Sequence, residues 1–101
     1  MDISNITDQV MVIVNKRWAH SPNEGPRKED AFIHLQEEIG EIARQLFNES
    51  IGSEKYSEQN LHEEIIDALF DILILARLSG VDVEAQITEK LQLLGERKQP
   101  R

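Results

Sequence analysis

The stretch LHEEIIDALFDILILARL, residues 61–78, decides the fold expected for this chain. Its central part, IIDALFDILILA, is apolar except for Asp67 and Asp71. On a helix that turns by about 100° per residue, Glu64, Asp67 and Asp71 fall within an arc of about 60°, and apolar side chains cover most of the remaining circumference. A helix of this composition is expected to be buried, either within the chain or in an assembly.

Three carboxylates on one stripe of a buried helix need an electrostatic partner. An ionised carboxylate that leaves water without a partner costs many kcal/mol, so the stripe requires protonation, basic neighbours or a cation. Few basic residues are nearby, because Arg77 lies on another side of the helix and no lysine occurs between Lys55 and Lys90. Of the three solutions, a bound metal ion is the simplest.

Composition narrows the class of protein. The 101 residues are enough for one domain, residues 1–101, with a single core that oligomerisation would help to stabilise. Eleven basic and nineteen acidic residues give a net charge of -8, which disfavours binding to nucleic acid through its phosphates. There are no cysteines, so oxygen or imidazole ligands would hold any metal ion.

The N-terminal segment shows no targeting signal. Asp2 stands where a signal peptide would carry basic charge, and the apolar run of residues 10–14 is too short to cross a bilayer. We therefore expect a cytoplasmic protein that has no contact with membranes.

Hydrophobic periodicity predicts four helices and no strand. Apolar residues recur at intervals of three and four along each segment, with Ser4 or Asn5 available as the first cap and Gly80 placed to end the third helix. The connectors are short, which favours an all-α fold built as an antiparallel four-helix bundle. The expected helices span residues 3–18, 29–48, 61–78 and 83–97. The apolar faces of the second and fourth helices comprise Phe32, Leu35, Ile39, Ile42, Ala43 and Leu46, and Val83, Ile87, Leu91 and Leu94.

Two pairs of carboxylates at a spacing of three residues stand on consecutive helices. Glu38 pairs with Glu41, and Glu64 pairs with Asp67, so each pair places two side chains one turn apart. If the two helices pack antiparallel, the pairs face each other and offer four carboxylates to one site, with Asp71 one turn beyond. Hard oxygen ligands of this kind select magnesium, manganese or calcium over zinc.

The simpler interpretation of such spacing is a solvated acidic face. It suits Glu37 and Glu63, because exposed charges on helices usually contact only water. It suits Asp67 and Asp71 less well, because both interrupt an apolar run.

The two acidic motifs resemble those of a known enzyme family. Glu37-Glu38-x-x-Glu41 followed by Glu64-x-x-Asp67 is similar to the EExxE and ExxD motifs of the MazG-like, all-α nucleoside triphosphate pyrophosphohydrolases. The likeness covers roughly residues 32–89, and the relatives include dimeric dUTPases, dCTP pyrophosphatases and phosphoribosyl-ATP pyrophosphohydrolases. It implies the fold of that family and a magnesium site, in which manganese can substitute, within a homodimer or homotetramer. The ligands implied are Glu38, Glu41, Glu64 and Asp67.

The resemblance also implies a reaction. A (deoxy)nucleoside triphosphate would be hydrolysed to the monophosphate and pyrophosphate, a chemistry suited to removing non-standard nucleotides. Glu37, Glu38 and Glu41 are the candidate catalytic residues. Either Glu37 or Asp71 could orient the attacking water, and the sequence does not choose between them.

Substrate contacts are expected from both ends of the chain. Trp18 resembles the aromatic residue that stacks on the base in some relatives, although an aromatic plug in the core is an equal alternative. Relatives also carry a lysine, an asparagine four residues later and an arginine beyond it. Lys90 and Arg97 match this pattern, whereas Leu94 replaces the asparagine and leaves the substrate class open. Asp71 is a further candidate contact.

The histidines favour no metal site on their own. His20, His34 and His62 occupy positions typical of surface residues, and the absence of a Glu-x-x-His pair argues against a di-iron bundle. Two alternatives to an enzyme remain at this point. One is a helical interaction module that buries its apolar third helix against a partner, and the other is a family member that binds nucleotide without cleaving it.

Overall fold

A computed structural model describes residues 2–96 as four α-helices. They are α1 (Ile3–Arg17), α2 (Lys28–Ser50), α3 (Glu58–Leu78) and α4 (Val83–Glu96). No strand occurs within this range, apart from an isolated bridge between Ser21 and Glu24. The expectation of an all-α chain with four helices is therefore confirmed.

The helix boundaries follow local capping chemistry. The first cap is Asp2, whose side chain accepts the Asn5 backbone N–H at 2.7 Å, so the prediction of Ser4 or Asn5 as the cap is wrong. The Ser57 hydroxyl caps α3 by accepting the Asn60 N–H at 3.1 Å. Gly80 follows the end of α3 with a φ of 73°, a left-handed conformation that glycine adopts readily, as the sequence predicts.

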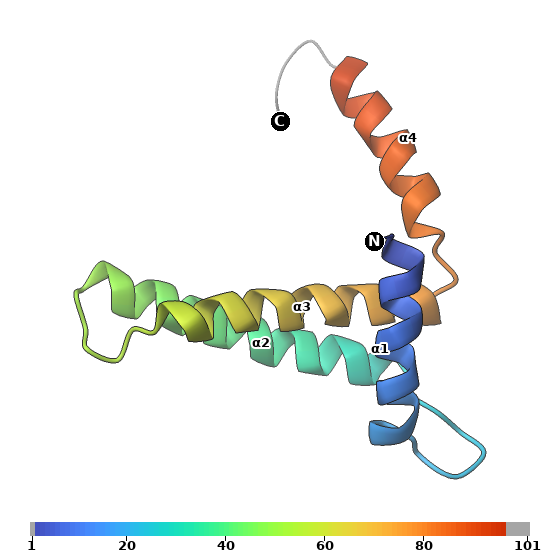
Figure 1. Cartoon of the computed structure of the whole chain (residues 1–101), viewed down its shortest axis with the longest axis horizontal. Helices are drawn as coiled ribbons and strands as arrows, with labels where there is room; N and C mark the ends of the chain where they lie inside the picture. The colour runs from blue at the N-terminus through green and yellow to red at the C-terminus, as the bar shows by residue number, and fades with distance from the viewer. Residues whose placement is uncertain (1, 97–101) are drawn as a thin grey trace.

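The chain is organised around an antiparallel hairpin of α2 and α3 (Figure 1). Helix α1 crosses this hairpin at the end where α2 begins and α3 ends, and α4 projects away from it. The radius of gyration is 16.6 Å, against about 13 Å for a compact domain of this length. Within one chain, α4 therefore does not close a four-helix bundle with the other three helices.

The apolar core lies at the crossing of α1 with the hairpin. Met11 and Val14 of α1 pack there with Ala31 of α2 and Ile74 of α3, and all four are buried. Partly buried apolar side chains, Trp18 among them, surround this cluster. The core is small. It holds α1 against the end of the hairpin where α2 begins and α3 ends.

Along the hairpin, several polar side chains face inward and many apolar side chains lie on the outer surface. Glu38 and Gln45 of α2 and Asp71 of α3 are buried, whereas Ile39 and Leu69 are about half exposed. Most of the apolar faces expected to be internal are likewise exposed, because the polar stripes of α2 and α3 face each other. The exposed members include Phe32, Ile39 and Leu46 on α2, Ile65, Ile66, Leu69 and Ile72 on α3, and Ile87, Leu91 and Leu94 on α4.

Shortening Ile74 tests this placement of the core. Ile74 is 1% exposed, so Ile74→Ala should lower the free energy of unfolding by about 2–5 kcal/mol, and Ile74→Val by about 1 kcal/mol. Urea denaturation at one fixed protein concentration measures both losses. Equal, negligible losses would place Ile74 outside the core.

Candidate functional site

Helices α2 and α3 hold acidic side chains along their shared interface. Glu38 is 8% exposed and Asp71 is 2% exposed, and Glu64 is partly buried. Glu41 and Asp67 are more exposed at the edge of the same interface. The two motifs therefore contribute side chains to one interhelical region, as their spacing predicts.

Burial and neighbouring carboxylates both raise pKa values within this cluster. Burial, followed by the charges of Glu41 and Asp67, raises the pKa of Glu38. Burial and then the adjacent carboxyl group of Glu41 raise the pKa of Glu64. Each group thus senses acidic neighbours on the facing helix as well as on its own. Two basic residues act on the cluster: His34 contacts Asp71, and the charge of Arg44 lowers the pKa of Glu64 without outweighing burial and the neighbouring acids.

Two oxygens inside the cluster lack a hydrogen-bond partner. Glu38 Oε2 and Glu64 Oε1 are fully shielded from solvent and accept no hydrogen bond from the described part of the chain. Buried polar atoms are almost always paired, so unpaired carboxylate oxygens indicate a missing donor or cation. An oxygen-only donor set of this kind fits a hard divalent cation such as magnesium.

The side chains are not arranged as a finished coordination sphere. In residues 2–96, no three Asp, Glu or His side chains lie at the spacing that holds a metal ion. Rotation of the carboxylates about their side-chain torsions would be needed to bring Glu38, Glu41, Glu64 and Asp67 onto one ion. The four carboxylates thus suit a hard divalent cation because they offer oxygen ligands and lie in one interhelical region.

His34 belongs to this site, although the sequence analysis treats it as a surface residue. Its Nδ1 lies 2.7 Å from Asp71 Oδ2 on α3, and its Nε2 lies 3.8 Å from Glu38 Oε1. Burial of the ring lowers the pKa of His34, but the hydrogen bond to Asp71 and the nearby Glu38 and Glu37 charges outweigh burial and raise it. Its position four residues before Glu38, on the same face of α2, was the signal that could have revealed it.

Trp18 packs against the core and also lines a cavity. Its ring packs against the apolar core and lies 5.4 Å from the His34 ring, with the planes tilted by 48°. It also lines a cavity of about 310 Å³ together with His34 and Glu37. The residue is therefore both a core neighbour and a wall of a cavity that reaches the acidic motif.

The C-terminal candidates are not brought to the carboxylates within one chain. Lys90 and Leu94 are exposed on α4, which packs mainly against α1 and leaves the hairpin. Arg97 lies outside the described residues. Their expected role as substrate contacts remains a prediction.

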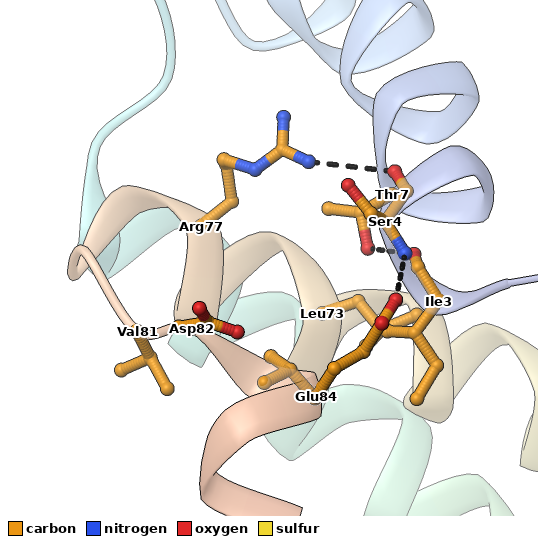
Figure 2. A pocket seen from close by; sticks show the side chains of 9 residues that line it. Ile3, Ser4, Thr7, Leu73, Arg77, Val81, Asp82 and Glu84 are labelled. Atoms are coloured by element: carbon orange, nitrogen blue, oxygen red, sulfur yellow. Dashed lines mark hydrogen bonds between the residues drawn. The ribbon is translucent and has the colours of Figure 1, made fainter.

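A larger cavity, of about 390 Å³, lies apart from the acidic cluster (Figure 2). It is bounded by the start of α1, the end of α3 and the start of α4. Here the Ser4 N–H donates to Glu84 at 3.3 Å, and Arg77 pairs with Asp8 at 2.7 Å. None of the motif carboxylates lines it, and the hydrogen bond from Ser4 to Glu84 joins α4 to α1 at its wall.

Scans against protein-family models, curated proteins and solved structures give no match to this chain. The likeness to MazG-like enzymes therefore rests on the two motifs of α2 and α3. None of the helices in residues 2–96 combines the length and apolar character that crossing a membrane requires.

The acidic cluster predicts how stability depends on pH. The folded chain raises the pKa of Glu38, Glu64, Asp71 and His34, so each group binds its proton more tightly when folded. The stability that this proton provides is complete below the ordinary pKa, 4.5 for Glu38, and is lost as the pH rises through the raised value. The melting temperature without metal should therefore fall between about pH 5 and about pH 8.

Glu38→Gln isolates one contribution to this slope. The neutral amide should melt at a higher temperature than the wild type at about pH 8, with a smaller difference at about pH 5. Circular dichroism in the presence of EDTA measures the melting curves, and Glu63→Gln, an exposed position on α3, is the matched control. A wild-type melting temperature that climbs across this range would contradict the electrostatic description of the cluster.

Proposed function

We propose that this chain is a magnesium-dependent nucleotide pyrophosphohydrolase of the MazG-like type. It converts a (deoxy)nucleoside triphosphate to the monophosphate and pyrophosphate, and the removal of non-standard nucleotides is the role that this chemistry suits. One observation carries the proposal: two facing acidic motifs on α2 and α3 contain two shielded carboxylate oxygens without a hydrogen-bond partner. Such a cluster is costly unless protons or a cation neutralise it, and one divalent ion would serve several of these oxygens at once.

The motif carboxylates would hold the ion. Glu38, Glu41, Glu64 and Asp67 provide the oxygen ligands, with manganese as a possible substitute for magnesium. When bound, the ion neutralises charge on the triphosphate and makes pyrophosphate a better leaving group.

The structure favours Glu37 over Asp71 as the residue that orients water. Asp71 is 2% exposed and engages His34, so its carboxylate is committed to a contact between helices. Glu37 is exposed and lines the cavity beside Trp18, where a substrate and a water molecule have access. Glu37 would accept a hydrogen bond from the attacking water, and Asp71 would act by fixing His34.

A second copy of this chain is the partner that the apolar surfaces fit best. The α2–α3 hairpin exposes apolar side chains along its length, and a single chain of this size buries few. Two identical hairpins related by a two-fold axis would bury these faces in a shared four-helix bundle. We therefore propose a homodimer, or a homotetramer built from two dimers, whose monomers offer the same surface to each other.

The same surfaces support a second candidate function. In a helical interaction module, a partner would cover the apolar faces, and the acids would carry no metal. A magnesium titration separates the two, because an ion that binds only the folded chain raises its melting temperature. Absence of any shift at millimolar magnesium would favour the module, whereas a shift without turnover would favour a nucleotide binder.

Substitution of the motif carboxylates tests the enzymatic proposal. Glu38→Gln and Asp67→Asn should each reduce pyrophosphate release by at least about 100-fold, because each removes an ionised ligand. The assay uses a panel of standard and modified nucleoside triphosphates with magnesium, and an EDTA control. Glu63→Gln, which changes an exposed glutamate on the same helix, should retain activity.

Isotope labelling identifies the bond that breaks. In water enriched in oxygen-18, attack at the α-phosphorus places the label in the monophosphate and leaves pyrophosphate unlabelled. Label in pyrophosphate, or full turnover by both carboxylate variants, would contradict the proposal.

The proposed assembly makes its own prediction. Light scattering after size-exclusion chromatography should give two or four times the chain mass. Leu69→Asp, at an exposed position of α3, should shift the protein towards monomer, because it places a charge in the buried interface. Gln59→Asp adds the same charge at an exposed polar position of α3 and should leave the mass unchanged. A monomeric wild type at micromolar concentration would exclude the assembly.

A further inference from the structure

The cavity beside Trp18 has the size and lining of a small-molecule subsite. Its volume of about 310 Å³ lies at the lower end of the range for ligand pockets. Trp18 and Ile33 provide apolar walls, and His20 and Asp30 provide a polar wall. Glu37 also lines it, so the cavity borders the acidic motif of α2.

Asp30 lines this polar wall with a partly exposed carboxylate that uses a single oxygen for its hydrogen bonds. Both of its hydrogen bonds use Oδ2, which accepts the Arg27 backbone N–H at 2.8 Å and lies 2.7 Å from His20 Nε2. Within residues 2–96, Oδ1 has no hydrogen-bond donor. The hydrogen bond from the Arg27 backbone N–H explains why an acidic residue occurs at the start of α2. This bond uses only one of the two carboxylate oxygens of Asp30.

Asp30 remains a negatively charged acceptor at neutral pH. The Arg27 backbone N–H, followed by the hydrogen bond to His20, lowers the pKa of this carboxyl group. The Arg27 guanidinium is paired with Glu24 and gives Asp30 no hydrogen bond. An ionised carboxylate accepts hydrogen bonds and donates none, so it suits an N–H donor and repels a carbonyl oxygen.

Nucleobases differ in whether their hydrogen-bonding edge offers an N–H donor or a carbonyl acceptor. Cytosine and adenine present an exocyclic amino group, whereas uracil and thymine present a carbonyl oxygen in the corresponding place. An aromatic ring beside the cavity would accept any base by stacking, so discrimination must come from the polar wall.

The resemblance to MazG-like enzymes already implies that Trp18 stacks on a base, and we propose that Asp30, on the polar wall of the same cavity, selects bases that carry an amino group over uracil and thymine. The inference rests on the proposed function, which places the triphosphate towards Glu37 and the carboxylates. Trp18 stacks on the base, and Ile33 contacts the base from the other apolar wall. Asp30 Oδ1 accepts a hydrogen bond from the amino group. His20 holds the Asp30 carboxylate in place through Oδ2.

Trp18 makes binding directly measurable, because it is the only tryptophan of the chain. Quenching of its fluorescence can be titrated with dCMP and with dUMP in magnesium-free buffer that contains EDTA. The two ligands carry the same phosphate charge, so repulsion by the acidic cluster affects both equally. We expect dCMP to bind about tenfold more tightly than dUMP, the effect of roughly one well-formed hydrogen bond.

Asp30→Asn tests the selecting residue. The amide oxygen can still accept the Arg27 N–H, while the amide N–H can donate to the uracil oxygen, so the preference for dCMP should disappear or reverse. Glu29→Gln removes the same unit of charge from the same turn of α2 at an exposed position outside the cavity lining and should preserve the preference. Circular dichroism confirms that both variants keep their helices.

The outcomes separate this inference from the proposed function. Equal quenching by dCMP and dUMP in the wild type, or no quenching by either, would overturn the base subsite whether or not the protein hydrolyses nucleotides. An unchanged preference in Asp30→Asn would overturn the role of Asp30. Discrimination in the binding assay without pyrophosphate release would support the subsite and refute the enzyme.

Discussion

The structure depends on the burial of carboxylates between α2 and α3. Placing Glu38 and Asp71 at a helix interface removes them from water, which is unfavourable for an ionised group. For Asp71, the 2.7 Å contact with His34 offsets part of this cost and ties the two helices together. Glu38 and Glu64 each retain a shielded oxygen without a donor, so the remaining cost is relieved only by a proton or by a cation such as the proposed metal ion.

Because the acids of α2 and α3 face inward, many apolar side chains of these helices lie on the outer surface. A helix that turns its polar stripe towards its neighbour necessarily turns its apolar residues elsewhere, as Ile39 and Leu69 show. The hairpin consequently has two unmet requirements, a positive charge between its helices and a cover for its outer faces. In the proposed enzyme, the metal ion would supply the first and a second copy of the chain would supply the second. One enzyme assembly would satisfy both, whereas a simple interaction module would satisfy only the second.

Much of the helical structure and part of the site could be predicted from the sequence. Three- and four-residue periodicity locates the helices, and the spacing of Glu38 with Glu41 and of Glu64 with Asp67 brings the acids to one interhelical region. The same periodicity locates an apolar stripe on each helix but does not indicate which surface packs against that stripe. The exposure of these faces and the outward course of α4 could therefore not be predicted. The contact of His34 with Asp71 joins positions 37 residues apart, which no local pattern encodes.

Trp18 links the core to both parts of the candidate site. Its ring packs beside the buried cluster at the crossing of α1, lies against His34, and lines the cavity that contains Asp30. His34 in turn contacts Asp71 on α3, so one chain of side chains runs from α1 through α2 to α3. The packing that positions α1 therefore also sets the distance between the base subsite and the carboxylates. The angle at which α1 crosses the hairpin would therefore set the length of nucleotide that can reach both regions. The reason is that Trp18, on which the base is proposed to stack, lies at this crossing.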